Sequence, residues 1–191
     1  MKPKLARSRV KNAVIYFAQN TEACGKIKLF KLLYLLDFDH FRETGRSVTG
    51  YEYEAWKFGP VPVSLMQEWE DLDEDLASAV EIVPERVIDY TRETVKVRNG
   101  VEFSDEDFTP RQLALMGRIA CEYRPTRSPK MIDVTHAQNG AWDKVWAGGV
   151  GAQQVIPYSF AIPDGAENRD LLLLIANESN GFSRQSIAEN H

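Results

Sequence analysis

Apolar residues recur at helical spacing near the start of the chain, where Val10, Val14 and Phe17 predict a first helix over residues 5–20. A short loop then leads into a second helix. Gly45 stands where a glycine in the left-handed conformation would end this second helix. The chain is therefore expected to open with two helices joined by a short loop.

The second helix is apolar over most of its circumference. On a helical wheel of residues 27–41, the polar side is one narrow stripe near Lys28, Lys31, Asp39 and Arg42, and we expect this stripe to be exposed. A helix that is apolar on its remaining sides is covered by its neighbours. The pattern therefore places this helix at the centre of the fold.

The segment that follows is rich in aromatic residues. Residues 51–57 (YEYEAWK) alternate in character, which predicts a short strand or extended arm whose successive side chains point to opposite sides. A Gly-Pro corner at residues 59–62 is expected to turn the chain. An amphipathic helix is expected from about Val63, with Leu65, Met66, Trp69 and Leu72 on its apolar side.

Turn and cap signals organise the second half of the chain. Asn99-Gly100 lies between two alternating apolar runs (TVKVRNGVEF), and this pair is the preferred two-residue hairpin turn, so we expect a β-hairpin here. Thr109 and Ser128 each precede a proline, which is typical of a helix start. Two further helices are therefore expected to begin at these positions.

A closing helix is expected over residues 166–177, followed by a polar tail. We divide the chain into one domain over residues 1–163 and a C-terminal helix and tail over residues 164–191. The predicted fold class is mainly α: a compact helical domain around a central buried helix, with one or two short antiparallel β-hairpins.

Composition and charge are those of an ordinary globular chain. Its 191 residues are 43% hydrophobic and 27% charged, and the formal net charge of -5 disfavours a dedicated nucleic-acid binder. Cys24 and Cys121 show no metal-type spacing, which indicates unpaired thiols in a reducing compartment. Neither a signal peptide nor a stretch of ~20 apolar residues is visible. We therefore expect a cytoplasmic protein without a membrane segment.

Asp37 falls near the centre of the apolar side of the second helix. A buried carboxylate needs hydrogen-bond donors, and the arm offers Tyr51, Tyr53 and Trp56 in addition to its backbone amides. We interpret Asp37 as a polar latch that fixes the arm to the helix. On this interpretation leucine at position 37 changes stability little, whereas lysine is severely destabilising.

Two histidines each follow an aspartate by three residues: His40 follows Asp37, and His136 follows Asp133. Such pairs can ligate a metal or act as an acid–base couple. The sequence offers no third ligand, so we assign His40 and His136 to the same structural polar contacts as Asp37. We expect no catalytic residue, no cofactor and no bound metal. A small metal-dependent hydrolase built on Asp37, His40 and His136 is the weaker alternative.

Two blocks of the sequence resemble a known family. KLFKLLYLLDFDH, followed by GRSVTGYEYEAWKFGPVP, is similar to the signature of the Panacea domain, also called the SocA-like antitoxin domain. THAQNGAWDKVW resembles a second block of that family, with Thr135, His136 and Trp142 at matching positions. The resemblance covers about residues 8–150. Residues 80–103 are longer and more strand-like than the linker expected between the blocks.

The resemblance implies an antitoxin, a protein without enzymatic activity that binds and neutralises a protein toxin encoded by a neighbouring gene. A homo-oligomer is compatible with this role. Aromatic and Gly-Pro clusters on a rigid scaffold are suitable binding anchors. The residues expected to bind the partner are Lys28, Lys31, Tyr51, Tyr53, Glu54, Trp56, Lys57, Gly59 and Pro60.

A DNA-binding transcriptional regulator is the alternative from another class of function. It would contact phosphates through a basic strip. The acidic net charge of the chain counts against this alternative. The strip would consist of Lys26, Lys28, Lys31, Arg42 and Arg46.

Overall fold

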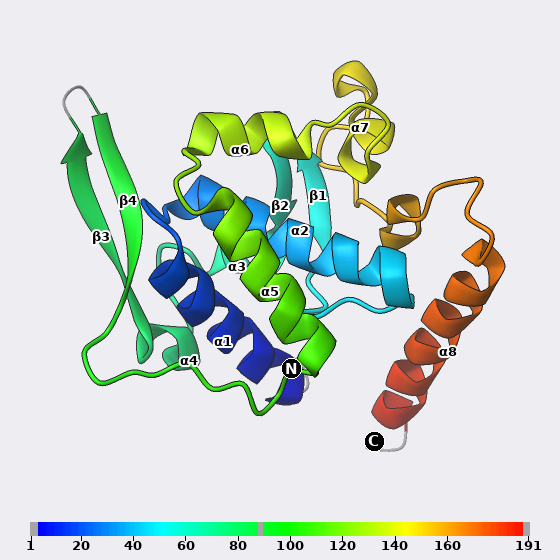
Figure 1. Cartoon of the computed structure of the whole chain (residues 1–191), viewed down its shortest axis with the longest axis horizontal. Coiled ribbons are helices and arrows are strands. Elements are labelled where there is room, and N and C mark those ends of the chain that lie inside the picture. The colour runs from blue at the N-terminus through cyan, green and yellow to red at the C-terminus, as the bar shows by residue number, and fades with distance from the viewer. Residues whose placement is uncertain (1–3, 88–89, 189–191) are drawn as a thin grey trace.

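A computed structural model describes residues 4–87 and 90–188 of the chain (Figure 1). This part of the chain contains eight α-helices and two antiparallel two-stranded sheets, so the predicted mainly α class is confirmed. The elements in chain order are α1 (Lys4–Asn20), α2 (Lys26–Thr44), β1 (Tyr53–Trp56), β2 (Gly59–Pro62), α3 (Val63–Gln67), α4 (Glu74–Ala77), β3 (Val80–Val87), β4 (Tyr90–Val97), α5 (Pro110–Tyr123), α6 (Ser128–Thr135), α7 (Ala141–Trp146), the 3-10 turns η1 (Ala147–Gly149) and η2 (Tyr158–Ala161), and α8 (Arg169–Ala188).

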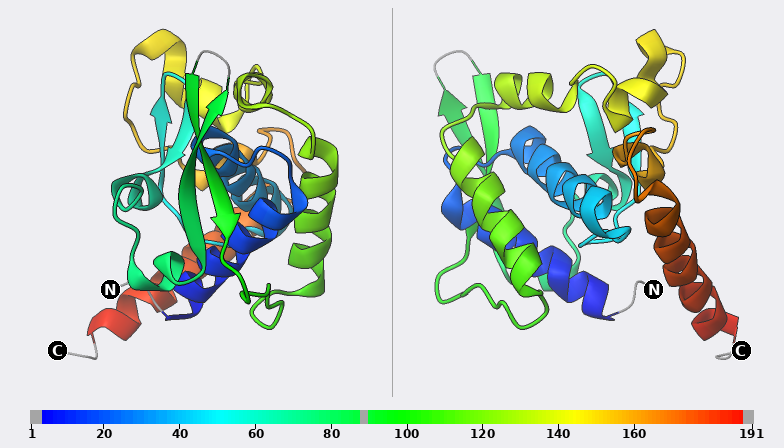
Figure 2. Two further views of the ribbon diagram at one scale, coloured as in Figure 1. Left: turned by 90° about the vertical axis from the view of Figure 1, so that its left-hand side faces the viewer. Right: turned by 45° about the vertical axis from the view of Figure 1, so that its right-hand side comes forward.

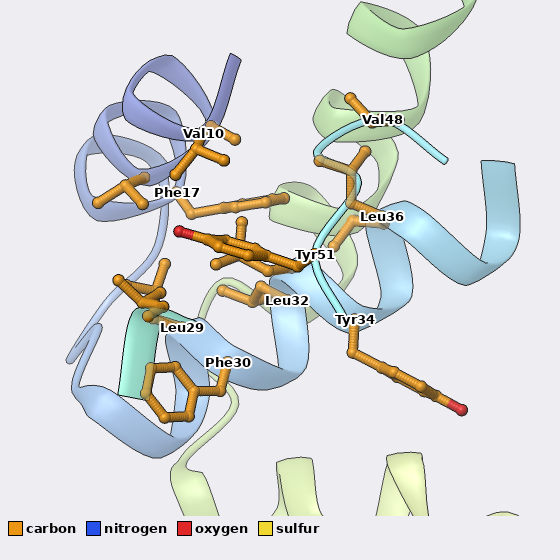
Figure 3. Close-up of a cluster of buried hydrophobic side chains, with 14 of the residues drawn as sticks. Val10, Phe17, Leu29, Phe30, Leu32, Tyr34, Leu36, Val48 and Tyr51 are labelled. Atoms are coloured by element: carbon orange, nitrogen blue, oxygen red, sulfur yellow. The ribbon is translucent and has the colours of Figure 1, made fainter. Parts of the chain in front are cut away.

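Helix α2 is the central helix, as its apolar circumference predicts. The helices α1, α5 and α6 and the β1–β2 hairpin surround it (Figures 1 and 2). Figure 3 shows Val10 and Phe17 of α1 and Leu32 and Leu36 of α2 packed around the ring of Tyr51. The aromatic arm therefore begins inside the main core.

The end of α2 also serves as the docking point of α8. Gly45 has φ 69° and its N–H donates to Phe41 O, so it is the left-handed cap that the sequence predicts. A Cβ at this position would lie 2.5 Å from Leu172 O, because the backbone of α8 rests on the glycine. Leu172 forms a small second core with Phe41 and Ile162. The domain boundary between residues 163 and 164 stays a prediction.

Lys28 is buried, and the prediction that it lies on an exposed stripe is wrong. Its side chain is 0% exposed, and its Nζ donates to Glu22 O and Arg124 O, both at 2.8 Å. These carbonyls follow the ends of α1 and α5, where the last turns of a helix lack partners within the helix. At this position the polar stripe binds the backbone of neighbouring segments and does not face water. Burial lowers the pKa of Lys28.

The strand before Asn99-Gly100 pairs with the segment that precedes it, and not with the segment after the turn as the sequence predicts. β3 pairs with β4, with Val80 opposite Val97 and Ile82 opposite Val95. Asn99-Gly100 is a turn after β4, where Val101 N donates to Arg98 O and no further strand follows. Pairing of β4 with β3 is favoured because it packs apolar residues of both strands, including Val80 and Val95, against the core. Residues 88–89, which join β3 to β4 in the sequence, are outside the described residues.

The helix expected from Val63 is also shorter than predicted, since α3 ends at Gln67. The chain then bends so that Glu68 binds Arg7 of α1 at 2.7 Å. Trp69 packs edge-on against Phe30 of α2, with ring centroids 5.3 Å apart. These long-range contacts, which the local pattern cannot show, favour the bend over a longer helix.

The outer edge of β3 carries a proline. Hydrogen-bonded pairs alternate along an antiparallel ladder. Arg98 N donates to Ala79 O, and Val95 N turns away from β3 to donate to Cys24 O. Because Ala79 and Arg98 form a hydrogen-bonded pair and Ile82 and Val95 do not, the backbone N–H and C=O positions of residues 82, 84 and 86 point away from β4. They face outward, since β3 lies at the margin of the molecule in Figure 1. Pro84 therefore removes an N–H from the open edge, which disfavours pairing with another strand.

Replacing Pro84 with valine is expected to cause self-association. Valine restores the missing N–H and has a high strand propensity, so β3 edges of two copies could pair. Sedimentation velocity should show dimers or larger species for Pro84→Val at concentrations where the natural chain shows none. The double variant Pro84→Val/Arg86→Pro, which moves the proline along the same edge, should behave like the natural chain. Equal association of all three would contradict the role of Pro84.

Candidate functional site

The β1–β2 hairpin has one buried and one outward side. Tyr53 and Ala55 are 1% and 0% exposed, whereas Glu54 and Trp56, which alternate with them along the strand, are partly exposed. This is the alternation expected for residues 51–57. The hairpin therefore presents Glu54 and Trp56, joined by a hydrogen bond from Trp56 Nε1 to Glu54 Oε2 of 2.9 Å, toward the outside.

Both edges of this hairpin are closed. On the β1 side, Ala55 N donates to Gln154 O and Gln153 N donates to Ala55 O. The same ladder phase turns Pro60 and Pro62 of β2 away from β1, so neither proline costs a ladder hydrogen bond. The outward carbonyl of Pro60 accepts from Lys31 Nζ at 2.8 Å. The Gly-Pro-Val-Pro segment is thus a strand, and the buried Lys31 side chain binds its outer edge.

Asp37 organises the chain that leads into the hairpin. It is 0% exposed, and its Oδ1 accepts from Val48 N at 2.8 Å and from Thr49 N at 2.7 Å. Its Oδ2 accepts from the hydroxyls of Thr49 and Tyr53. The predicted burial of Asp37 and its bond from the arm are confirmed. Burial raises the pKa of Asp37, and these four donors oppose the shift.

His40 supports the same loop from one turn further along α2. Its Nδ1 lies 2.6 Å from Arg46 O, which is a hydrogen bond to the backbone with the imidazole as donor. Asp37 and His40 therefore each hold part of the segment between α2 and β1. In the described part of the chain, no group of three or more histidine, cysteine, aspartate or glutamate side chains is placed to share a metal ion.

Lys31 joins the hairpin to α6. Its side chain is 2% exposed, so the prediction that it lies on an exposed stripe is also wrong. Gly59 has φ +98°, and a Cβ there would lie 2.7 Å from Lys31 Nζ and 2.9 Å from Thr135 Oγ1. Only glycine allows this close approach. Burial lowers the pKa of Lys31 to about 7.

A stack of three rings backs the hairpin from the side of α7. His136 stacks on Trp142 at 3.7 Å between ring centroids, and Trp142 stacks on Trp146 at 5.4 Å. Trp142 Nε1 donates to Trp56 O at 3.1 Å, which ties the stack to the end of β1. His136 Nε2 is buried and has no hydrogen-bond partner among the described residues. Burial, and next the charge of Lys31, lower the pKa of His136.

The tip of the hairpin exposes an aromatic residue that the sequence analysis missed. Phe58 is 60% exposed, and Lys57 Nζ lies 5.7 Å from the centroid of its ring. Val155, which bridges to Glu54 on the outward side of β1, is 46% exposed. Sequence reasoning placed the turn at the Gly-Pro corner of residues 59–62, but these residues form β2 and the chain turns at Lys57 and Phe58, so the exposed position of Phe58 was missed. We call Glu54, Trp56, Lys57, Phe58 and Val155 the hairpin-tip surface.

The residues expected to bind a partner thus divide into two groups. Glu54, Trp56 and Lys57 belong to the hairpin-tip surface. The others are buried, and Lys28 lies away from the hairpin, beside the ends of α1 and α5. The buried set supports the surface from behind: Lys31, Tyr51, Tyr53, Gly59 and Pro60.

The basic strip of the DNA-binding alternative does not form. Lys28 and Lys31 are buried. Lys26 lies 3.7 Å from Glu70, and Arg42 lies 2.8 Å from Asp39, so acidic groups accompany both cations. The structure therefore removes the observation on which that alternative rested.

These features define a helical domain in which two distant sequence blocks meet around one hairpin. Its motif residues Lys31, Gly59, Thr135 and Trp142 lie together, although up to 111 positions (142 minus 31) separate them in the chain. The family model described as "Antitoxin SocA-like, Panacea domain" matches residues 29–143, more than half of the chain. The chain belongs to this family of SocA-like antitoxins.

The matched residues 29–143 include most of α2, the β1–β2 hairpin, α6 and the start of α7. Helix α8 lies outside this range. Neither a curated protein nor a solved structure matches the chain. Within the described residues, no helix has both the length and the apolar character needed to cross a membrane.

Proposed function

We propose that this chain is the antitoxin of a toxin–antitoxin system and that it binds and neutralises a protein toxin encoded by a neighbouring gene. Membership of the SocA-like antitoxin family supports this role. The chain acts by binding, without an enzymatic step, a metal or a cofactor, and it works in the cytoplasm. The hairpin-tip surface is the part that contacts the toxin.

The observation that carries the proposal is the exposure of Phe58 at the tip of a rigid hairpin. Phe58 does not stand alone, because Trp56 and Val155 are partly exposed on the same hairpin-tip surface, and an exposed apolar patch beside polar groups marks an interaction site. Aromatic anchors next to charged groups are typical of binding hot spots. Phe58 stands between Lys57 and the buried Gly59, with Trp56 and Glu54 on the strand before it.

Rigidity supports the same assignment. Lys31 holds Pro60, Trp142 holds Trp56, and residues 153–156 cover the free edge of β1. A surface that is ordered before binding loses little conformational entropy when the partner arrives. The closed edges also exclude addition of a partner strand to this hairpin, so the contact is made by side chains.

A growth assay tests the role. The open reading frame next to this gene should stop growth when it is expressed alone, and co-expression of this chain should restore growth. A matched control is the chain with Asp37→Lys, which is expected to be unfolded and should not rescue. The role is wrong if no adjacent gene is toxic, or if a toxic neighbour is not neutralised by the natural chain.

A further inference from the structure

The junction between the hairpin and α6 contains a buried amine without a carboxylate partner. Lys31 Nζ donates to Pro60 O at 2.8 Å, and among the described residues no ion pair includes Lys31. Thr135 Oγ1 lies beside the same glycine, since a Cβ on Gly59 would be 2.7 Å from Lys31 Nζ and 2.9 Å from Thr135 Oγ1. A buried ammonium that is not paired strongly disfavours the closed arrangement.

His136 lies at the same junction, and its surroundings disfavour a positive charge on its ring. Its Nε2 is buried without a hydrogen-bond partner, and its ring is fixed by the stack on Trp142. The charged groups that act on His136 come from three elements. Lys31 of α2 lowers the pKa of His136, whereas Asp133 of α6 and Asp143 of α7 raise it. From β2, Pro60 contributes only a carbonyl oxygen.

We propose that Lys31, Gly59, Pro60, Thr135 and His136 form a proton-operated joint. The joint holds the β1–β2 hairpin against α6 while Lys31 is neutral, and it releases the hairpin when Lys31 takes up a proton. The joint belongs to the free chain, so it can be measured without a partner and independently of the toxin assay. Because the hairpin carries the tip surface, the joint would make presentation of that surface depend on pH.

The direction of the effect follows from the two states of Lys31. In water the amine has its ordinary pKa of 10.5, whereas burial in the closed joint lowers this pKa to about 7. Opening therefore takes up a proton between these two values. The open state gains population as the pH falls through this window, by up to about tenfold per pH unit for one proton. Raising the pH closes the joint.

Amide hydrogen exchange on the purified chain tests the joint. Protection factors of hairpin amides such as Ala55 and Val61 should fall about tenfold per pH unit between about pH 10 and pH 7. Lys31→Met keeps the length of the side chain without the amine and should remove this dependence. Amides of β4 around Val95 should show no such slope in either protein, because local opening there leaves Lys31 covered.

The pKa of Lys31 can be measured directly in the natural chain, so the proposal can be tested even if Lys31→Met does not fold. The NMR signal of the Lys31 Cε carbon should titrate near neutral pH in the natural chain. Titration of Lys31 at its ordinary pKa of 10.5 would overturn the joint. So would hairpin protection that is independent of pH, an unchanged slope in Lys31→Met, or hairpin amides that exchange only together with those of α5.

Discussion

Replacing Asp37 with leucine is expected to remove most of the stability of the fold. Leucine leaves four buried donors without an acceptor: the amides of Val48 and Thr49 and the hydroxyls of Thr49 and Tyr53. Each buried donor without a partner costs about 1–3 kcal/mol. Their sum is comparable to the ~5–15 kcal/mol that stabilises a typical domain. From the sequence alone, leucine was expected to change stability little, because it removes a buried charge together with the latch; the four donors found in the structure reverse this expectation.

Urea denaturation measures this effect. Asp37→Leu should unfold at far lower urea than the natural chain, Asp37→Asn should lie between the two, and Asp37→Lys should not fold. The matched control is Asp39→Asn on the same helix, where a partly exposed carboxylate bound to Arg42 should contribute about 1 kcal/mol or less. If Asp37→Leu proved as stable as the Asp39→Asn control, Asp37 would not be what holds the arm.

Replacing Phe58 with aspartate is expected to abolish neutralisation of the toxin without unfolding the chain. Phe58 is 60% exposed, so its loss removes little burial from the free protein. At the centre of an interface, the same change would remove an apolar anchor and bury a charge, a loss of about 2 kcal/mol or more for a hot spot (roughly 30-fold in affinity). Growth rescue should therefore fail for Phe58→Asp and weaken for Trp56→Ala.

The matched control for this prediction is Leu174→Asp on α8. Leu174 is 56% exposed and apolar, and α8 lies outside the matched family domain. It should rescue growth as well as the natural chain. Rescue by Phe58→Asp, with circular dichroism showing that both variants fold, would move the binding surface elsewhere. The β3–β4 hairpin within residues 80–103 would then be the next candidate.

Much of the helical frame could be predicted from local patterns. The apolar wheel identified α2 as central, and Thr109-Pro110 marked the start of α5. There Thr109 accepts from Gln112 N while the Gln112 side chain accepts from Thr109 N, a capping box made by neighbours in the sequence. Such elements depend on residues within one or two turns, so the sequence displays their causes directly.

The errors arise where distant backbone decides the outcome. Lys28 and Lys31 are polar and were expected in water, but the carbonyls of Arg124 and Pro60 that they reach are invisible to a helical wheel. Asn99-Gly100 does form a turn, yet the choice of β3 as the partner of β4 depends on core packing. The candidate site combines both kinds of residue, so the buried latch at Asp37 that supports it was predicted and its exposed tip at Phe58 was not.

The binding affinity between this chain and the product of the toxic neighbouring gene tests the central claim most directly. Isothermal titration calorimetry on the purified pair should give a tight complex for the natural chain and for Leu174→Asp, and a dissociation constant at least about 30-fold higher for Phe58→Asp. No binding by the natural chain, or equal affinity of all three proteins, would contradict an antitoxin that acts through the hairpin-tip surface.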